Sequence, residues 1–250
     1  MRVLLTFISI SLLFGSLKAH AQDSSPSTGI KTIFKKEYYG GIVLHTQGLG
    51  LNFRASKFLN VDLRRILGLE MVNIKHAKEF KSYNPYVASG NKSFVYGKKN
   101  SVLSLRPTFG REMVMFHKLA KRGVQISRVW MAGPALAFVK PVYLVVYNPN
   151  GEGGRTSLER YDELKHRFDL IDGRGPMLKG IEESELVPGV HLKYGFNFEY
   201  APEAETVRSF EVGMNFDAYY KPISIMAFEN DQQFFVTLYA NFFFGKKYLH

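Results

Sequence analysis

The sequence contains no cysteine, so no disulfide can stabilise the fold and no thiol chemistry is available. The absence also excludes a lipoprotein, which needs a cysteine directly after its N-terminal apolar segment. Beyond that segment, no run of residues is apolar and long enough to cross a membrane as a helix. Only helices and closed barrels satisfy all backbone polar groups in lipid. If this chain crosses a membrane, it must therefore do so as a β-barrel.

Several signatures of catalysis are missing as well. There is no Gly-x-Ser-x-Gly elbow for a nucleophilic serine and no His-x-x-x-His pair for zinc. The Gly-Glu-Gly-Gly segment at 151–154 lacks the flanking strand and helix of a phosphate-binding loop. The sequence therefore predicts no catalytic, metal-binding or cofactor-binding residues, and no cofactor.

The N-terminus has the three parts of a secretory signal peptide. Arg2 is the positive residue, residues 3–14 are apolar, and a small-x-small cleavage site ends at Ala21. An uncleaved anchor is the alternative, but the apolar run is shorter than the ~20 residues of a spanning helix. We therefore expect a signal peptide over 1–21, a flexible periplasmic lead-in over 22–36 and one folded domain over 37–250.

The charge is strongly positive, at +11 for the whole chain. Such a surplus favours acidic partners. Nucleic acid is not expected for an exported protein. Outer-membrane lipid, the phosphates of lipopolysaccharide or an acidic protein surface fit better.

Strict alternation of apolar and polar residues dominates the last third of the chain. Over 190–200, Val, Leu, Tyr and Phe share one strand face, while His, Lys, Asn and Glu share the other. The segment 210–217 repeats the pattern. An aromatic-rich apolar face of about ten residues is long enough for a tilted strand to cross a bilayer. The pattern predicts a transmembrane barrel with apolar residues outside and polar residues inside.

We expect an all-β, eight-stranded antiparallel up-and-down barrel. The predicted strands are 37–46, 49–54, 60–74, 101–114, 124–138, 190–200, 210–217 and 233–245, with 143–147 as a continuation of the fifth. Short links follow strands two, four and six, and long loops follow strands three and five. Outer-membrane barrels have short periplasmic turns and long external loops, which places the N-terminus in the periplasm. Ten strands are the alternative, if 142–147 pairs separately and another strand lies in a long loop.

The polar strand faces would meet inside the barrel. An eight-stranded barrel is just wide enough for side chains to fill, and buried charges must be paired. We expect a polar network with Arg54, Arg106 and Lys193 paired to carboxylates, and a conducting pathway is the alternative. The predicted lumen residues are Asn52, Arg54, Glu70, Ser104, Arg106, Thr108, His191, Lys193, Asn197, Glu199, Glu211, Asn215, Asp217, Thr237 and Asn241.

Four segments of this chain are similar to a known group. They are Gly-Pro-Ala-Leu-Ala-Phe-Val-Lys-Pro-Val-Tyr at 133–143, Pro-Gly-Val-His-Leu-Lys at 188–193, Phe-Phe-Val-Thr-Leu-Tyr at 234–239 and Phe-Gly-Lys-Lys-Tyr at 244–248. In these segments the chain resembles uncharacterised outer-membrane β-barrel proteins of Bacteroidota-type, Gram-negative bacteria. In general form that group resembles the small porin-family and secretion-associated barrels. The resemblance implies a cell-envelope barrel and carries no catalytic residues.

The C-terminus departs from the usual pattern of such barrels. They generally end on an aromatic residue that the insertion machinery reads, whereas this chain continues past Phe244 for six residues, to His250. Either Tyr248 takes that role or the recognition signal is internal.

Two long loops carry candidate binding residues. The first, about 75–100, mixes lysines with aromatic residues and predicts either a solvated loop or a surface for lipid head groups or a partner. Its candidates are Lys75, Lys78, Lys81, Tyr83, Tyr86, Lys92, Lys98 and Lys99. The second, about 148–188, begins a capping-box pattern at Thr156 and predicts a short helix that closes the rim or binds a partner. The apolar residues of that helix would be Leu158, Tyr161, Leu164 and Phe168.

An enzyme is the second functional hypothesis, because some eight-stranded barrels are lipid A acyltransferases or deacylases. His45 and His76 lie at about the right depth, but neither has a serine or carboxylate fixed beside it in the sequence. The sequence therefore predicts a structural or accessory subunit of an envelope assembly. A narrow channel, a lipid A-modifying enzyme and a soluble periplasmic lipid-binding barrel are the alternatives.

Overall fold

A computed structural model describes residues 34–86, 92–118, 123–147, 156–201, 203 and 205–249. All of them belong to one compact unit that spans residues 33–250. The predicted signal peptide over 1–21 and nearly all of the predicted lead-in lie outside the described residues. No helix within the described ranges is long and apolar enough to cross a membrane.

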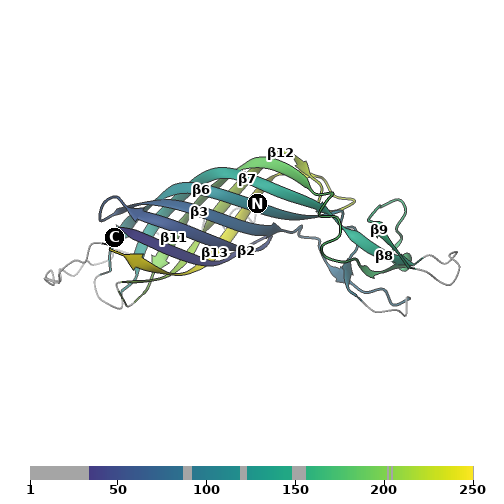
Figure 1. Cartoon of the computed structure of the whole chain (residues 1–250), viewed down its shortest axis with the longest axis horizontal. Coiled ribbons are helices and arrows are strands. Elements are labelled where there is room, and N and C mark those ends of the chain that lie inside the picture. The colour runs from purple at the N-terminus through teal and green to yellow at the C-terminus, as the bar shows by residue number, and fades with distance from the viewer. Residues whose placement is uncertain are drawn as a thin grey trace, which may run out of the picture. The chain divides into compact units, whose positions relative to one another are not determined.

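Eight long strands close into one antiparallel barrel, in the order β1-β13-β12-β11-β7-β6-β3-β2 (Figure 1). They are β1 (Lys36–His45), β2 (Gly48–Phe58), β3 (Leu63–Ile74), β6 (Asn100–Phe116), β7 (Gln125–Pro141), β11 (Glu185–Glu199), β12 (Thr206–Ile223) and β13 (Gln232–Tyr248). Pairing of β1 with β13 completes the ring, so the barrel has no free sheet edge. The prediction of an eight-stranded up-and-down barrel is confirmed, and the ten-stranded alternative is wrong.

Two prolines interrupt one ladder of the barrel. Between β6 and β7, pairing passes from Leu105 and Leu136 directly to Phe109 and Ala132. Pro107 and Pro134 lie in that gap. Proline has no N–H to donate to a neighbouring strand, so the two occupy one local break in the pairing.

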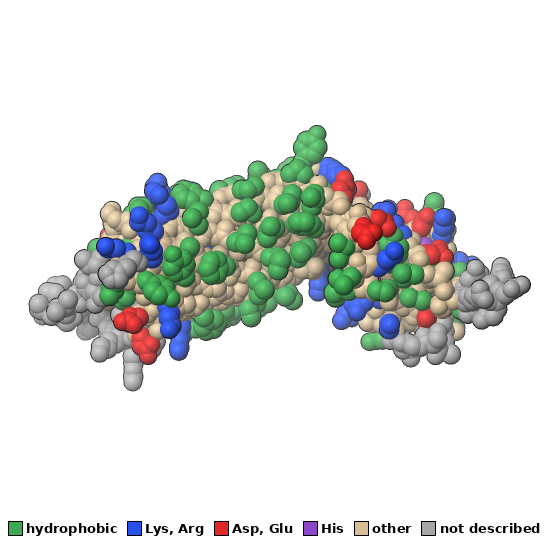
Figure 2. Space-filling view, in the orientation of Figure 1, with side chains coloured by type: hydrophobic (Ala, Val, Ile, Leu, Met, Phe, Trp, Pro, Cys, Tyr) green, Lys and Arg blue, Asp and Glu red, His purple; other side chains and the backbone are tan. Residues whose placement is uncertain are grey.

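The inner and outer faces of the barrel wall differ sharply in polarity. Buried arginine, lysine, glutamate and asparagine side chains line the inside, whereas exposed leucine, phenylalanine, tyrosine and methionine side chains cover the outside. Figure 2 shows the hydrophobic side chains spread over the barrel, with charged side chains gathered towards its ends. A soluble lipid-binding barrel would need its apolar face turned inward along its length. The structure contradicts that alternative.

The loops at one end of the barrel build a second small structure. A three-stranded sheet joins β8 (Tyr143–Tyr147) to β9 (Thr156–Arg160) and β10 (Ile171–Arg174), and a hairpin pairs β4 (Lys81–Ser82) with β5 (Phe94–Val95). Their shared core includes Phe94, Leu144 and Ile171. We call the described parts of 75–99, 142–184 and 224–231 the loop module.

The structure corrects two predictions in this region. The segment 143–147 does not extend the fifth barrel strand, because β7 ends at Pro141 and β8 belongs to the separate sheet. The predicted helix is wrong as well, because Thr156–Arg160 is the strand β9, paired residue by residue with β8. Only a 3₁₀ turn, η1 (Phe168–Leu170), is helical there. The valine-rich β8 gives the segment a strand partner, and tertiary pairing overrides the weak helical spacing.

Candidate functional site

The interior of the barrel holds a central ion-pair cluster. Arg54 on β2 makes two hydrogen bonds to the carboxylate of Glu211 on β12, at 2.6 and 2.8 Å. Both side chains are 1% exposed or less. The Glu211 carboxylate also accepts hydrogen bonds from Tyr239 at 2.9 Å and Asn241 at 3.2 Å. Two strands lie between β2 and β12 in the ring, so the ion pair crosses the lumen.

Arg106 on β6 links a second set of charges within this cluster. It donates to Glu70 at 3.0 Å and to Asp217 at 2.7 Å. Glu70 also accepts from Asn52 at 3.0 Å and from the ammonium of Lys193. The His191 ring pairs through its Nδ1 with Asp217, at 2.7 Å.

The positive and negative charges of the central cluster are equal in number. Its cations are Arg54, Arg106 and Lys193, and its carboxylates are Glu70, Glu211 and Asp217. A buried ion pair stabilises a fold only when its geometry is good and its remaining polar atoms are bonded. Removal of one member would leave an uncompensated charge in a medium of low polarity. The cluster therefore fixes which strands face one another across the lumen.

A second cluster fills the barrel end where β1 begins and β13 ends. Arg64 lies 3.3 Å from Glu37, 3.7 Å from Glu112 and 3.6 Å from Glu199. Lys247 and Lys118 contact Glu199 at 2.7 and 3.1 Å. Glu199, which the sequence predicts in one network with Arg54 and Arg106, instead belongs to this second cluster.

Sequence reasoning missed most of the second cluster. Arg64 is in phase with the predicted lumen residue Glu70 along β3, and Glu112 is in phase with Arg106 along β6. The period-2 alternation was therefore a usable signal for both residues. Of the other predicted lumen residues, Ser104, Asn197, Asn215 and Thr237 are buried inside the barrel, and Thr108 is partly exposed.

The opposite end of the lumen is apolar. Val43, Ile74, Val102 and Phe235 pack there with Met226, which comes from the 224–231 loop. The backbone of that loop is held by hydrogen bonds, such as Lys99 N–H to the Ile225 carbonyl at 3.0 Å. This part of the loop module therefore closes the end of the barrel.

The predicted basic-aromatic loop does not form one uniform basic surface. Three of its lysines have carboxylate partners: Lys78 with Glu229 at 2.5 Å, Lys98 with Glu79 at 2.5 Å, and Lys99 with Glu163 at 3.4 Å. The exposed residues of the set are Lys75, Lys78, Lys81, Tyr83, Tyr86 and Lys92. Among the described residues of this loop, lysines without an ion pair and exposed tyrosines therefore occupy only part of its surface.

The four residues of the predicted helix lie in different surroundings. Tyr161 and Phe168 pack into the core of the loop module, and burial raises the pKa of Tyr161 to about 12. Leu158 is 41% exposed and Leu164 is 92% exposed. The set therefore does not form one apolar face.

The two candidate catalytic histidines have backbone partners. The Nδ1 of His45 accepts the Gln47 N–H at 3.3 Å, and the Nδ1 of His76 accepts the Lys78 N–H at 3.2 Å. Across the described ranges, neither ring is hydrogen-bonded to a serine or a carboxylate. In the described residues, neither histidine therefore forms the nucleophile–base pair, oriented by a third group, that marks an activated nucleophile.

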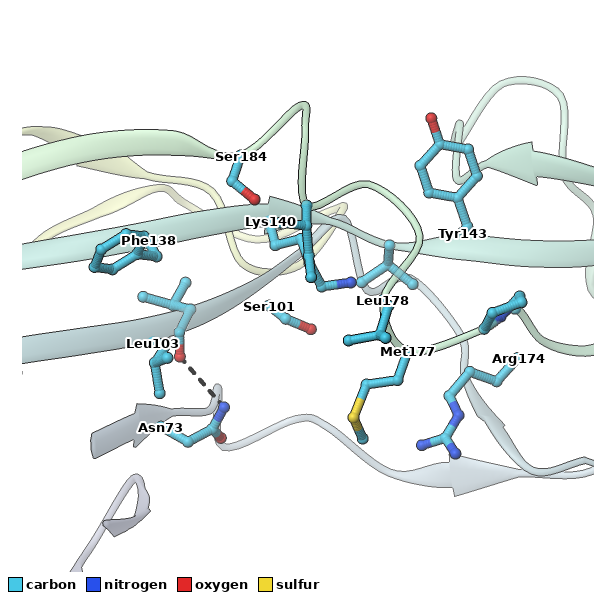
Figure 3. Close-up of a pocket in the computed structure, with 15 residues that line it drawn as sticks. Asn73, Ser101, Leu103, Phe138, Lys140, Tyr143, Arg174, Met177, Leu178 and Ser184 are labelled. Atoms are coloured by element: carbon cyan, nitrogen blue, oxygen red, sulfur yellow. Dashed lines mark hydrogen bonds between the residues drawn. The ribbon is translucent and has the colours of Figure 1, made fainter. Parts of the chain in front are cut away.

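A groove of about 490 Å³ lies between the outer wall of the barrel and the segment 174–184. Figure 3 shows Leu103 and Phe138 on the barrel side, with Met177 and Leu178 from the loop segment. Lys140, at the end of β7, and Arg174, at the end of β10, also line the groove. The site therefore combines an apolar lining with two cations.

Comparison with known proteins gives the fold alone. No family model and no curated protein matches the chain. Among solved structures, the chain is similar to Neisserial surface protein A, with 10% identity, a TM-score of 0.39, and coverage of 87% of this chain and 97% of that one. It is also similar to Ail, the attachment invasion locus protein of Yersinia pestis, with 9% identity, a TM-score of 0.39, and coverage of 86% and 97%. At this identity and TM-score the likeness says nothing about function.

Proposed function

We propose that this protein is an integral outer-membrane barrel that acts as a structural or accessory subunit of an envelope assembly and presents its loop module outside the cell. The observation that carries the proposal is the reversed polarity of the barrel. Exposed side chains such as Leu51, Phe53 and Leu192 would be unfavourable against water, whereas hydrocarbon accepts them. The compact loop module supports a role in contact with a partner, because it has a core of its own.

A narrow channel is the first alternative, and the filled interior argues against it. In the central cluster, Arg106 is 1% exposed, and Glu211 and Asp217 are 0% exposed. A water-filled pathway between these side chains would give them accessible surface. We therefore expect purified protein in planar bilayers to give no steady conductance. Stable single-channel currents that change in Glu211→Gln would contradict this part of the proposal.

A lipid A-modifying enzyme is the second alternative. The ring of His45 meets a backbone N–H, which favours a structural role. We expect lipid A to have the same acylation pattern in cells with and without the protein, as measured by mass spectrometry. A change that appears with the protein and disappears in His45→Ala would favour the enzyme.

Heat-modifiability on a gel tests the membrane assignment. A closed barrel resists cold SDS, so unboiled and boiled samples from outer-membrane fractions should migrate differently. Recovery in the soluble periplasmic fraction without such a shift would overturn the proposal.

Mild detergent extraction tests the accessory role. We expect envelope proteins to co-purify with the wild-type chain and to be lost when Ile171→Asp disrupts the core of the loop module. The heat shift of this variant should persist, because Ile171 lies outside the barrel. Purification without partners from the wild-type strain would count against an accessory subunit.

A further inference from the structure

The groove at the rim has apolar side chains where a water-exposed loop would normally be polar. Met177 is 70% exposed, Leu178 is 75% exposed and Ile181 is 53% exposed. They line the groove together with Leu103 and Phe138, which belong to the outward apolar face of the barrel. The groove is therefore continuous with the wall that faces hydrocarbon in the proposed function.

Two cations, Lys140 and Arg174, line the same groove. The ammonium of Lys140 donates to the Lys179 carbonyl at 3.1 Å, which uses one of its three N–H donors. Within the described ranges, Arg174 has no ion pair with a carboxylate. The nearby Glu183 is engaged by the Tyr143 hydroxyl and lies 3.9 Å from Arg160. Positive charge at the groove is therefore left for an external anion.

We propose that this groove binds a phosphate-bearing membrane lipid, with the anionic head group in the part lined by Lys140 and Arg174 and an acyl chain along Leu103 and Phe138. The inference rests on the proposed membrane location. A guanidinium and an ammonium suit a phosphate well, because charge-assisted hydrogen bonds to phosphate are strong. The volume of about 490 Å³ lies in the usual range for a small-molecule site.

A lipid fits the groove better than a soluble phosphate compound does. A soluble anion would satisfy Lys140 and Arg174 but would leave Met177, Leu178 and Ile181 facing water. An acyl chain covers these side chains at the level where the barrel wall enters the membrane. One ligand then contacts both the cations and the apolar side chains of the groove.

Native mass spectrometry of the full mature chain, folded in an uncharged maltoside detergent, tests the proposal. The probes are a long-chain phosphatidic acid, a phosphatidylcholine with the same chains, and inorganic phosphate. We expect one phosphatidic acid to be retained in preference to the other two. Equal retention of phosphatidylcholine, or inorganic phosphate that binds as tightly as the lipid, would overturn the proposal.

Charge-removing variants test whether phosphatidic acid binds at the groove. A cation near an anionic lipid contributes roughly fivefold in affinity, so Lys140→Gln/Arg174→Gln should weaken phosphatidic acid binding by roughly 25-fold. The matched control, Lys165→Gln/Arg167→Gln, removes the same charges from another exposed part of the loop module and should change binding by less than about twofold. Equal affinity in the groove variant and the wild type would show that the groove is not the site.

Leu178→Ser tests the apolar part of the groove lining. It should reduce the preference for long-chain over short-chain phosphatidic acid, and an unchanged preference would contradict acyl-chain binding in the groove. The heat shift of each sample separates the two proposals. A wild-type sample without a shift contradicts the membrane barrel, whereas a normal shift without lipid selectivity contradicts the groove alone.

Discussion

Arg54 and Glu211 are 157 positions apart in the sequence, yet their side chains make a two-point ion pair across the lumen, at 2.6 and 2.8 Å. The pair joins β2 to β12 without a backbone ladder between them. It therefore ties together two parts of the barrel wall that are not neighbours in the sheet. The guanidinium also lies over the ring of Phe243, with its central carbon 4.6 Å from the ring centroid.

Breaking this pair should destabilise the barrel strongly. Arg54→Met leaves the Glu211 charge buried without its partner, and we expect a loss of about 3–5 kcal/mol in the free energy of unfolding. Arg54→Met/Glu211→Leu should lose much less, although Tyr239 and Asn241 then lack an acceptor. Urea unfolding, followed by the fluorescence of Trp130, the chain's single tryptophan, measures both. Arg65→Met on the exposed face is the control, and losses that simply add in the double variant would contradict coupling.

Asn84 should control the stability of the loop module. Its amide nitrogen contacts the carbonyl oxygens of Phe168, Asp169 and Ile171 at 3.2, 2.9 and 2.7 Å. Asn84→Ala should weaken this segment by about 1–3 kcal/mol, because buried acceptors lose their donor. Faster limited proteolysis of the module, with an unchanged heat shift, is the expected result.

Asn84→Asp separates the loss of the hydrogen-bond donor from the loss of the side chain's shape. The aspartate has nearly the same shape and can still accept the Tyr86 N–H, which now bonds to the Asn84 side-chain oxygen at 2.9 Å. It cannot donate to the three carbonyls. We expect proteolysis at least as fast as in Asn84→Ala, and resistance equal to wild type would show that the donor side of Asn84 is unimportant.

Glu159 should give part of the loop module a dependence on pH. Hydrogen bonds from Ser157 and His166 lower the pKa of the Glu159 carboxyl below its usual 4.5. A lowered folded-state pKa stabilises the fold above the unfolded pKa, and this contribution is lost as the pH falls through the folded value. The effect is small, because the side chain is half exposed. An NMR titration of the Glu159 carboxyl should show a midpoint that rises in Ser157→Ala, and an unchanged midpoint would contradict the role of that hydroxyl.

Tyr248 is the best candidate for the terminal aromatic residue that insertion machinery would read. The structure continues β13 to Tyr248, which pairs with Lys36, and the Tyr248 ring lies 5.8 Å from that of Tyr38. We expect Tyr248→Ser to lower the heat-modifiable protein in outer-membrane fractions several-fold and to leave refolding in detergent unchanged. Phe244→Ser, also outward-facing, is the matched control. If both variants assemble like wild type, the recognition signal is internal.

The loop module shows why local sequence patterns failed there. The predicted helix residues Leu158, Tyr161, Leu164 and Phe168 have helical spacing, but the strand β8 pairs with β9, and of the four only Tyr161 is fully buried. Four residues at that spacing are a weak signal, whereas the neighbouring valine-rich strand pairs with β9 along its whole length. Pairing between strands leaves no mark on the periodicity within either segment.

The sequence by itself determined the barrel, because strand alternation has a period of two residues and places each side chain inside or outside without knowledge of its neighbours. Alternation indicated that Glu199 and Arg54 are both internal, but not that they belong to different clusters. That separation depends on strand register and on position along the barrel axis. Only the tertiary structure decided which charges meet, which loops share a core, and where a groove forms, because each of these brings together residues distant in the chain.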